Sequence, residues 1–438
     1  MGIFSKEEAR KIMEKAMSFS TADACTINLS GSESGNIRYA RNSVSTAGAQ
    51  SNHSLAVNSS YGKKSGTATI DEFDDASLEK VIKRAEELAQ LAPENPEYME
   101  PLGPQVYDAS KTYVEATANV TPEYRAEVAN SSIMPAKTKD VTAAGFLEDS
   151  SGFNAMLNSK GLFAYNKSTD VSFTVTMRTN DGTGSGWVTR DFNDITKFDA
   201  KEASKIAIDK AVMSREAKAI EPGKYTVILE PSAALGLLQG LGRSINARSA
   251  DEGRSFMSKK GGGTKLGEKI VDERVNLWSD PLNDQVPAPT WNGSGQALKK
   301  TTWIENGVVK NLAYGRYWAK EKGVEPVPFP SNFIMAGGDA SLDDLIKSTK
   351  KGILVTRLWY IRSVDPQTLL YTGLTRDGTF YIENGKIKYP VKNFRFNESP
   401  IIMLNNLETL GQQVRVDGSL IPYMKVRDFT FSSLSDAV

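Results

Sequence analysis

Histidine and cysteine are almost absent from this sequence. Its 438 residues contain one histidine, His53, and one cysteine, Cys25. A catalytic zinc ion normally takes three protein ligands, drawn mostly from histidine, cysteine and carboxylate side chains. A Ser-His-Asp or Cys-His site needs an imidazole as its base. We therefore expect neither kind of site within this chain, so any hydrolytic activity would use carboxylates, lysine or tyrosine, or be supplied by another polypeptide.

The sequence also lacks an excess of either charge and any long apolar run. Lysine plus arginine and aspartate plus glutamate each number 53, so the net charge is zero. Proteins that bind nucleic acid usually carry a basic excess, so we expect no nucleic-acid partner. No apolar run approaches the ~20 residues of a membrane span, and we expect no membrane association. A single cysteine cannot form an internal disulfide bond, which fits a cytoplasmic location.

The order of helix and strand patterns predicts an α+β protein of three domains. Residues 1–92 read as a helix, a β-meander and a second helix with an apolar stripe. A proline-rich stretch over residues 93–112 predicts a linker, because proline interrupts both helices and central strands. Residues 113–221 predict a middle domain of helices and a β-meander. Residues 222–438 predict a large, mostly-β domain that forms an open sheet or a barrel-like structure.

Glycine and Asn-Gly pairs suggest where the strands end. Short strands are expected in both meanders, with ends near glycine or polar residues; they cover residues 24–30, 34–42, 43–50 and 54–60, then 141–147, 153–158, 161–167, 170–178 and 184–190. Asn306-Gly307 and Asn384-Gly385 lie between β-forming residues and predict type I′ hairpins. The recurrence of this hairpin indicates similar outer ribbons on one large sheet.

Three features that could suggest a site have simpler structural interpretations. His53 lies between polar residues, and we interpret it as a surface or strand residue. Cys25 alternates with its neighbours in a predicted strand, and a small buried residue is expected there. The glycines of the run 259–263, Lys-Lys-Gly-Gly-Gly, lack the strand and helix that flank a phosphate-binding loop, so a mobile loop is expected.

Other polar and aromatic groups leave more than one interpretation open. Ser255 and Ser258 precede Lys259 and Lys260, but such Ser–Lys pairs are frequent by chance. The pairs Asp251-Glu252 and Asp272-Glu273 are interpreted as solvated charges rather than a metal or acid–base site. The proline-rich segment 326–333 could line a peptide-binding cleft or form a rigid loop. Its candidate cleft residues are Phe329, Pro330 and Asn332.

Four short segments, taken in order, resemble a known family. They are 37–42 (Ile-Arg-Tyr-Ala-Arg-Asn), 158–161 (Asn-Ser-Lys-Gly), 221–229 with Pro231, and 304–307 (Ile-Glu-Asn-Gly). Their order and spacing along the chain resemble the TldD/PmbA family, which is also labelled "modulator of DNA gyrase". The resemblance implies a metallopeptidase assembly in the cytosol that trims or degrades unfolded peptides.

The resemblance also implies which type of family member this is. TldD-type chains carry His-Glu-x-x-x-His on a helix after the strand that opens the last domain, plus a C-terminal cysteine, and these bind zinc. PmbA-type chains, also called TldE, lack the motif and pair with a TldD-type subunit. Laid over this chain, the histidine positions hold Gln239 and Ser244, the glutamate position holds Gly240, and residues 410–427 contain no cysteine. The resemblance thus implies no catalytic or metal-binding residue in this chain.

Several functions remain in competition at this point. The leading hypothesis is a non-catalytic PmbA/TldE-type subunit that shapes a peptide cleft while its partner supplies zinc and the general base. The alternative is a stand-alone homodimeric peptide- or ligand-binding protein that has lost peptidase activity. A third is an enzyme of another class that uses Asp251, Glu252 or Lys259. The gyrase label implies direct action on a DNA enzyme, which neither the charge nor the motifs support.

Overall fold

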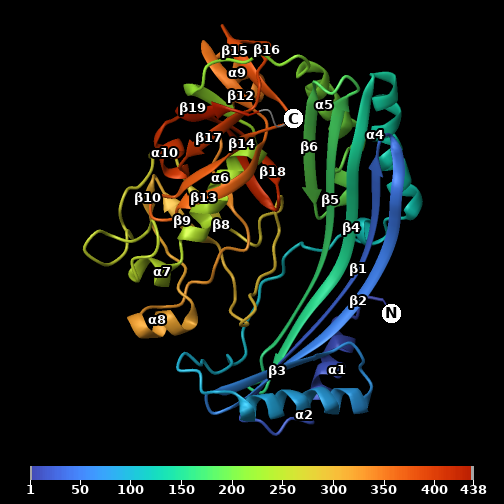
Figure 1. Ribbon diagram of the computed structural model, residues 1–438. Helices are drawn as coiled ribbons and strands as arrows, with labels where there is room; N and C mark the ends of the chain where they lie inside the picture. Colours follow the sequence, from blue (N-terminus) through green and yellow to red (C-terminus); the bar gives the residue numbers. More distant parts are fainter. Residues whose placement is uncertain (1, 436–438) are drawn as a thin grey trace.

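The computed structural model describes residues 2–435 and contains two large sheets (Figure 1). A long curved sheet runs down one side of the molecule, and the C-terminal domain lies beside it. The helices are α1 (Lys6–Met17), α2 (Asp75–Leu91), α3 (Glu115–Ala118), α4 (Pro122–Thr138), α5 (Ala200–Met213), α6 (Pro231–Ser244), α7 (Ala247–Asp251), α8 (Arg316–Lys322), α9 (Leu342–Lys347) and α10 (Pro400–Asn405), with a 3-10 turn at Ile195–Lys197. The expected α+β fold class is confirmed.

The curved sheet is built from both of the first two sequence segments. Its strands are β1 (Ala24–Ala40), β2 (Ser43–Tyr61), β3 (Lys64–Ile70), β4 (Val141–Asn158), β5 (Phe163–Thr179) and β6 (Ser185–Phe192). They follow the order β3-β2-β1-β4-β5-β6, and all neighbours are antiparallel. Strand β1 pairs with β4 from Thr26↔Asn158 to Tyr39↔Gly145, so residues 1–92 and 113–221 share one continuous sheet.

The prediction of short strands that end at glycines or polar residues is wrong, because β1, β2, β4 and β5 continue through those positions. The glycines in β1 provide space rather than turns. A Cβ on Gly31 would lie 2.5 Å from the ring of Phe153, and one on Gly35 would lie 1.9 Å from the guanidinium of Arg125. A glycine in a strand often marks such a close approach. The sequence could not distinguish the two roles, because the neighbours come from distant segments.

Helices cover one face of the curved sheet in two groups. Helix α1 begins with a capping box at Ser5 and Glu8 and packs with α2 against β1 and β2. Helices α4 and α5 pack against β4 and β5 further along the sheet, where Val128 and Ala207 belong to a second apolar cluster. No helix of residues 2–435 combines the length and apolar character needed to span a membrane.

The C-terminal domain is built around a 13-stranded open sheet within the described residues. Its strands are β7 (Gly223–Leu229), β8 (Leu277–Ser279), β9 (Thr301–Glu305), β10 (Val308–Val309), β11 (Ile334–Met335), β12 (Lys351–Val355), β13 (Leu358–Asp365), β14 (Leu370–Thr375), β15 (Thr379–Glu383), β16 (Lys386–Pro390), β17 (Phe394–Glu398), β18 (Leu407–Val416) and β19 (Ser419–Leu434). The central path is β10-β9-β8-β11-β19-β7-β12-β15-β16.

The two Asn-Gly hairpins lie at opposite ends of this path. Asn306 and Gly307 have φ angles of 49° and 76°, and Asn384 and Gly385 have 49° and 74°. Positive φ at both central residues is the requirement of a type I′ turn. The predictions of the two hairpins and of similar outer ribbons are therefore confirmed.

Helix α6 follows the buried strand β7 and lies in the core of the C-terminal domain. Glu230 takes the N-cap position, and Pro231 occupies the first turn, where its missing N–H is not needed. Leu235, Leu238 and Leu241 recur at helical spacing along one side of α6, and all three are buried. The opposite face of the helix carries Gln239 and Arg243 toward a cavity.

The proline-rich stretch between α2 and α3 crosses to the C-terminal domain and is held there by hydrogen bonds. Tyr107 Oη donates to the carbonyl oxygen of Gly295 at 2.7 Å, and Ser110 Oγ donates to that of Pro281 at 2.7 Å. No helix or strand forms over residues 93–112, as expected from its prolines. This stretch therefore fastens the curved sheet to the C-terminal domain.

Candidate functional site

The candidate site is a cavity of about 560 Å³ beside helix α6. Helix α6 forms one wall, the loop after α7 forms a second, and strands β13 and β14 with the turn between them form a third. The lining residues are Gly236, Gln239, Gly240, Arg243, Ser244, Ser249, Arg254, Ser255, Ile361, Arg362, Ser363, Pro366, Leu369 and Tyr371. All three degenerate motif positions on α6 therefore face one cavity.

Two of these motif positions have polar partners from within the chain. Ser244 is buried, and its Oγ donates to the carbonyl oxygen of Leu241 at 2.7 Å. Gln239 Nε2 donates to Asp417 Oδ2 at 3.3 Å, which links α6 to the turn between β18 and β19. An amide and a hydroxyl held in this way stabilise the wall but supply no strong metal ligand.

Gly240, which the family resemblance places at the position of the general base, has no room for a side chain. A Cβ built there would lie 2.4 Å from the hydroxyl oxygen of Tyr371, a contact that real structures essentially never show. Two residues on, a Cβ at Gly242 would lie 2.5 Å from the ring of Phe333. The aromatic rings thus fill the space that a glutamate and its neighbours would occupy.

The zinc ion that the family resemblance implies does not fit the residues of this cavity. Its lining contains no histidine, cysteine, aspartate or glutamate. Across the part of the chain that the structure describes, no three such side chains lie close enough together to hold a metal ion. Zinc sites are built from these side chains, so no chemical step through a metal is derived for this chain.

The charge of the lining is instead positive. Three arginines reach the cavity, Arg243 from α6, Arg254 from the loop after α7 and Arg362 from β13. Arg254 Nε is paired with Glu252 at 2.9 Å, whereas Arg362 lies over the ring of Tyr360 at 4.2 Å. Arg243 is exposed and forms no hydrogen bond or ion pair with any residue in the range 2–435. The sequence offered one hint, since Arg243 lies four residues after Gln239 on the same helix face.

The carboxylate pairs named from the sequence are engaged in ion pairs. Asp251 accepts from Trp318 Nε1 at 2.8 Å, and Glu252 pairs with Arg248 at 2.9 Å. Asp272 accepts from Arg274 at 2.7 Å, and this interaction helps lower the pKa of Asp272 to about 2. Glu273 lies 3.5 Å from Lys269. None of the four carboxylates lines the cavity beside α6.

The serine–lysine arrangement does not form a catalytic pair. Ser255 Oγ donates to the carbonyl oxygen of Ser244 at 3.0 Å, and Ser258 Oγ accepts from the backbone N–H of Ser255 at 3.3 Å. Lys259 pairs with Glu268 at 2.9 Å. Neither serine has a lysine positioned to take its proton, so these hydroxyls hold the loop in place. Lys260 is exposed.

The three predicted cleft residues do not line the cavity beside α6. Asn332 is buried and joins two loops, since its Nδ2 donates to the carbonyl oxygens of Asp280 and Val286 at 2.8 and 2.7 Å. Phe329 is 48% exposed, and Pro330 is partly exposed. Asn332 therefore acts as a structural bracket within an irregular loop.

The isolated histidine and cysteine lie in the N-terminal part of the curved sheet. His53 on β2 lies against the rings of Phe4 and Phe153, with centroid distances of 4.9 and 6.3 Å. Cys25 is buried, and burial raises the pKa of its thiol. The glycines at 261–263 have φ angles of 93°, 110° and 80° in an irregular turn. The positions of His53 and Cys25 agree with their structural interpretations, and the run 259–263 forms an irregular turn whose mobility stays a prediction.

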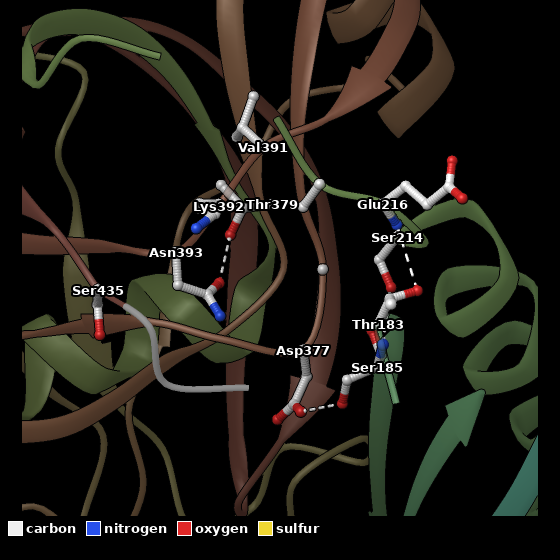
Figure 2. A pocket seen from close by; sticks show the side chains of 12 residues that line it. Thr183, Ser185, Ser214, Glu216, Asp377, Thr379, Val391, Lys392, Asn393 and Ser435 are labelled. Carbon is white, nitrogen blue, oxygen red and sulfur yellow. Dashed lines mark hydrogen bonds between the residues drawn. The ribbon is translucent and has the colours of Figure 1, made fainter. Parts of the chain in front are cut away.

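A second cavity, of about 260 Å³, lies between the curved sheet and the C-terminal domain (Figure 2). Figure 2 shows the Asp377 carboxylate pointing toward Ser185, whose Oγ donates to it at 2.6 Å. Asp377 also pairs with Arg357 at 2.6 Å, and Ser214 Oγ donates to the carbonyl oxygen of Ser185 at 2.8 Å. These polar groups satisfy one another across the domain boundary, so we interpret this cavity as part of the junction.

Comparison with known proteins assigns the chain to a family along most of its length. Three domain profiles match in order: PmbA/TldA metallopeptidase domain 1 over residues 25–89, the central domain over 100–215 and the C-terminal domain over 222–433. A metalloprotease of Methanothermobacter thermautotrophicus is 25% identical over 292 residues, which cover 61% of this chain and 62% of that protein. Metalloprotease PmbA of Escherichia coli O157:H7 is 23% identical over 215 residues, which cover 46% of each chain. The chain thus matches less than two thirds of the length of either relative.

Solved structures show the same fold over nearly the whole chain. TldE from Thermococcus kodakarensis superposes with a TM-score of 0.87 and 19% identity, covering 97% of this chain and 99% of that one. A Bacteroides thetaiotaomicron protein, named as a candidate modulator of DNA gyrase, superposes with a TM-score of 0.86 and 22% identity, covering 98% and 99%. Together with the three matching domain profiles, which span most of the sequence, these results show that the chain belongs to the TldD/PmbA family of metallopeptidases.

Proposed function

We propose that this chain is a non-catalytic PmbA/TldE-type subunit of a heteromeric zinc metallopeptidase that trims or degrades unfolded peptides in the cytosol. The proposal rests on the residues that helix α6 carries at the positions of the family's zinc motif. Gln239, Gly240 and Ser244 line one cavity, and the hydroxyl of Tyr371 closes off Gly240. A partner that carries His-Glu-x-x-x-His would then supply both the zinc ion and the general base.

The role proposed for this chain is to complete and shape the peptide cleft. Strand β13 pairs only with β14 among the described strands, and its residues Ile361, Arg362 and Ser363 line the cavity. An edge strand can add an extended peptide through backbone hydrogen bonds, which gives affinity with little dependence on sequence. An unfolded chain is the kind of substrate that such an edge suits.

A tagged purification from the native cell tests the heteromeric assembly. We expect a near-stoichiometric homologue that carries His-Glu-x-x-x-His to co-elute and to be identified by mass spectrometry. Recovery of a clean homodimer without such a partner would reject the assembly and favour the alternative of a stand-alone peptide- or ligand-binding protein. The purified pair would next be assayed for hydrolysis of an unfolded peptide, with each subunit alone as the control.

Metal analysis of the isolated chain tests its non-catalytic role. Because the cavity offers no histidine, cysteine or carboxylate, we expect no stoichiometric zinc after dialysis. The measurement is zinc per chain by mass spectrometry, with Gln239→Ala and Ser244→Ala as matched variants. One zinc per chain that survives dialysis and disappears in these variants would contradict the proposal.

A further inference from the structure

The cavity beside α6 has the chemistry of an anion site. Its lining includes Arg243, Arg254 and Arg362 but no aspartate or glutamate. Two of these arginines, Arg243 and Arg362, form no ion pair with a carboxylate anywhere in residues 2–435. Guanidinium groups bind carboxylates and phosphates through paired, charge-assisted hydrogen bonds. The positive charge is therefore available to a ligand rather than used within the fold.

A hydroxyl with no partner inside the protein provides a second, independent indication of a ligand. Tyr371 is only 7% exposed and lines the cavity, yet its hydroxyl forms no hydrogen bond with any described residue. Its oxygen reaches the open space of the cavity, where it can donate to a ligand. The hydroxyl oxygen lies against Gly240, so the ring presents it at the cavity wall formed by α6. A bound anion would accept a hydrogen bond from this hydroxyl.

The size and the remaining lining indicate what carries the negative charge. A cavity of about 560 Å³ is much larger than a single inorganic anion, and Ile361, Pro366 and Leu369 give it an apolar part. The ligand should therefore join an anionic group to an apolar body. Strand β13 is also an edge strand among the described strands, so an extended peptide could pair with its backbone. An extended peptide therefore fits the positive charge, the apolar part of the lining and the edge strand together.

We propose that this cavity binds the free C-terminal carboxylate of a peptide whose last residue is apolar. Arg243 and Arg362 would hold the carboxylate, and Tyr371 would donate to it. Arg254 is already paired with Glu252, so we assign it no contact with the carboxylate. The proposal rests on the peptide-handling function proposed above. It adds that the former metal position of this subunit anchors one end of the substrate.

Binding of two matched peptides to the purified full-length chain tests the proposal. The probes are fluorescein-labelled Gly-Ser-Gly-Ser-Ala-Leu with a free C-terminal carboxylate and the same peptide as its C-terminal amide, compared by fluorescence polarisation. We expect the free acid to bind at least about tenfold more tightly, as for a charged hydrogen-bonding group. Equal affinity of the acid and the amide would overturn the proposal.

Arginine variants locate the interaction. Arg243→Gln and Arg362→Gln should each weaken binding of the acid by about tenfold and leave binding of the amide unchanged. Arg84→Gln, which changes an exposed arginine on α2, is the matched control and should alter neither. Circular dichroism checks that each variant is folded, and two separate arginines keep the test valid if one variant fails to fold. Unchanged acid binding in both folded variants would overturn the proposal.

A competition experiment distinguishes a peptide terminus from a phosphate group. Inorganic phosphate should displace the acid peptide only at concentrations far above the peptide's dissociation constant. Displacement at concentrations similar to the peptide's own would overturn the assignment to a carboxylate terminus. Capture of the His-Glu-x-x-x-His partner by Arg243→Gln should be unchanged, so loss of the partner and loss of acid preference report separately on the proposed function and on this inference.

Discussion

At the scale of single residues, Tyr371 packs so closely against Gly240 that no side chain fits at position 240. Gly240 stands where the family resemblance places a general base, and the ring of Tyr371 occupies the space of its missing side chain. Restoring the glutamate alone would therefore not restore the site.

The coupling between Gly240 and Tyr371 can be measured. We expect Gly240→Ala to destabilise the protein by about 1–3 kcal/mol, because the new Cβ overlaps the hydroxyl of Tyr371. In the background Tyr371→Ala the same change should be neutral or stabilising, since alanine is favoured over glycine in a helix by about 1 kcal/mol. A double-mutant cycle of urea unfolding measures the interaction, and strictly additive effects would show that the contact does not exist.

A buried carboxylate in the N-terminal part gives a pH-dependent prediction. Glu86 on α2 accepts from the N–H groups of Thr21 and Ala22 at 2.7 and 3.1 Å and from Ser20 Oγ at 3.0 Å. Burial raises the pKa of Glu86, but these hydrogen bonds outweigh it, and the pKa lies below its ordinary value. A lowered pKa means that the stabilisation is present above the unfolded-state pKa of about 4.3 and is lost as the pH falls through the folded-state pKa.

We therefore expect Glu86→Gln to lower the free energy of unfolding by about 1–3 kcal/mol at pH 7. The difference from the unsubstituted protein should shrink as the pH falls below about 4. Urea unfolding at a series of pH values measures both. Glu87→Gln, on an exposed position of the same helix, is the control and should have little effect. A difference that stays constant from pH 7 to pH 3 would contradict the assignment.

At the scale of secondary-structure elements, glycines allow β1 and β4 to run unbroken through crowded positions. The guanidinium of Arg125, from α4, lies over Gly35 and pairs with Asp149 of β4 at 2.6 Å. Both charged side chains are largely buried, at 11% and 6% exposure. The helix and the sheet are thus joined through a space that only glycine leaves open.

We expect an alanine at Gly35 to destabilise the protein much more than an alanine at Gly48 in the neighbouring strand. Gly35→Ala is expected to destabilise the protein by about 2–4 kcal/mol, because it displaces Arg125 and leaves Asp149 buried without its partner. Gly48 lies in the paired strand β2, and a Cβ there would come no closer than 4.0 Å to another side chain, that of Asn36, so Gly48→Ala is the matched control. Thermal unfolding of both variants measures the difference, and equal melting temperatures would refute the packing role.

At the scale of the whole molecule, Asp191 makes several of the contacts between the curved sheet and the C-terminal domain. Asp191 of β6 accepts from the N–H groups of Asp417 and Gly418 at 2.7 and 2.9 Å and from Arg415 Nε at 3.0 Å. Asp417 in turn accepts from Gln239 of α6. The turn between β18 and β19 thus connects the domain junction with the wall of the candidate cavity.

We expect Asp191→Asn to loosen this junction without unfolding either domain. Hydrogen exchange of residues 413–420 should become faster, because the carboxylate that accepts from this turn loses its charge. Asp209→Asn, on an exposed site of α5, is the control and should leave this exchange unchanged. Unaltered exchange in Asp191→Asn would show that the turn is held by other contacts.

The sequence by itself determined the features that depend on neighbours along the chain. The Asn-Gly turns, the cap at Ser5 and the leucine stripe of α6 follow from local backbone and periodicity, so they were predictable. The near-absence of histidine and cysteine is also visible without any structure, and it is the basis of our expectation that this chain holds no zinc site of the usual kind.

Only the tertiary structure decided which distant residues meet. Gly31 follows the end of a predicted strand, yet β1 continues through it, and side chains from other elements lie close to both Gly31 and Gly35. Arg243 carried one local hint, but Arg362 and Tyr371 lie more than a hundred positions away and reach its cavity through the β13–β14 hairpin. Long-range pairing in a sheet is set by packing and register rather than by any local signal. Only the tertiary structure therefore shows that Gln239, Gly240 and Ser244 line a cavity whose other residues include three arginines.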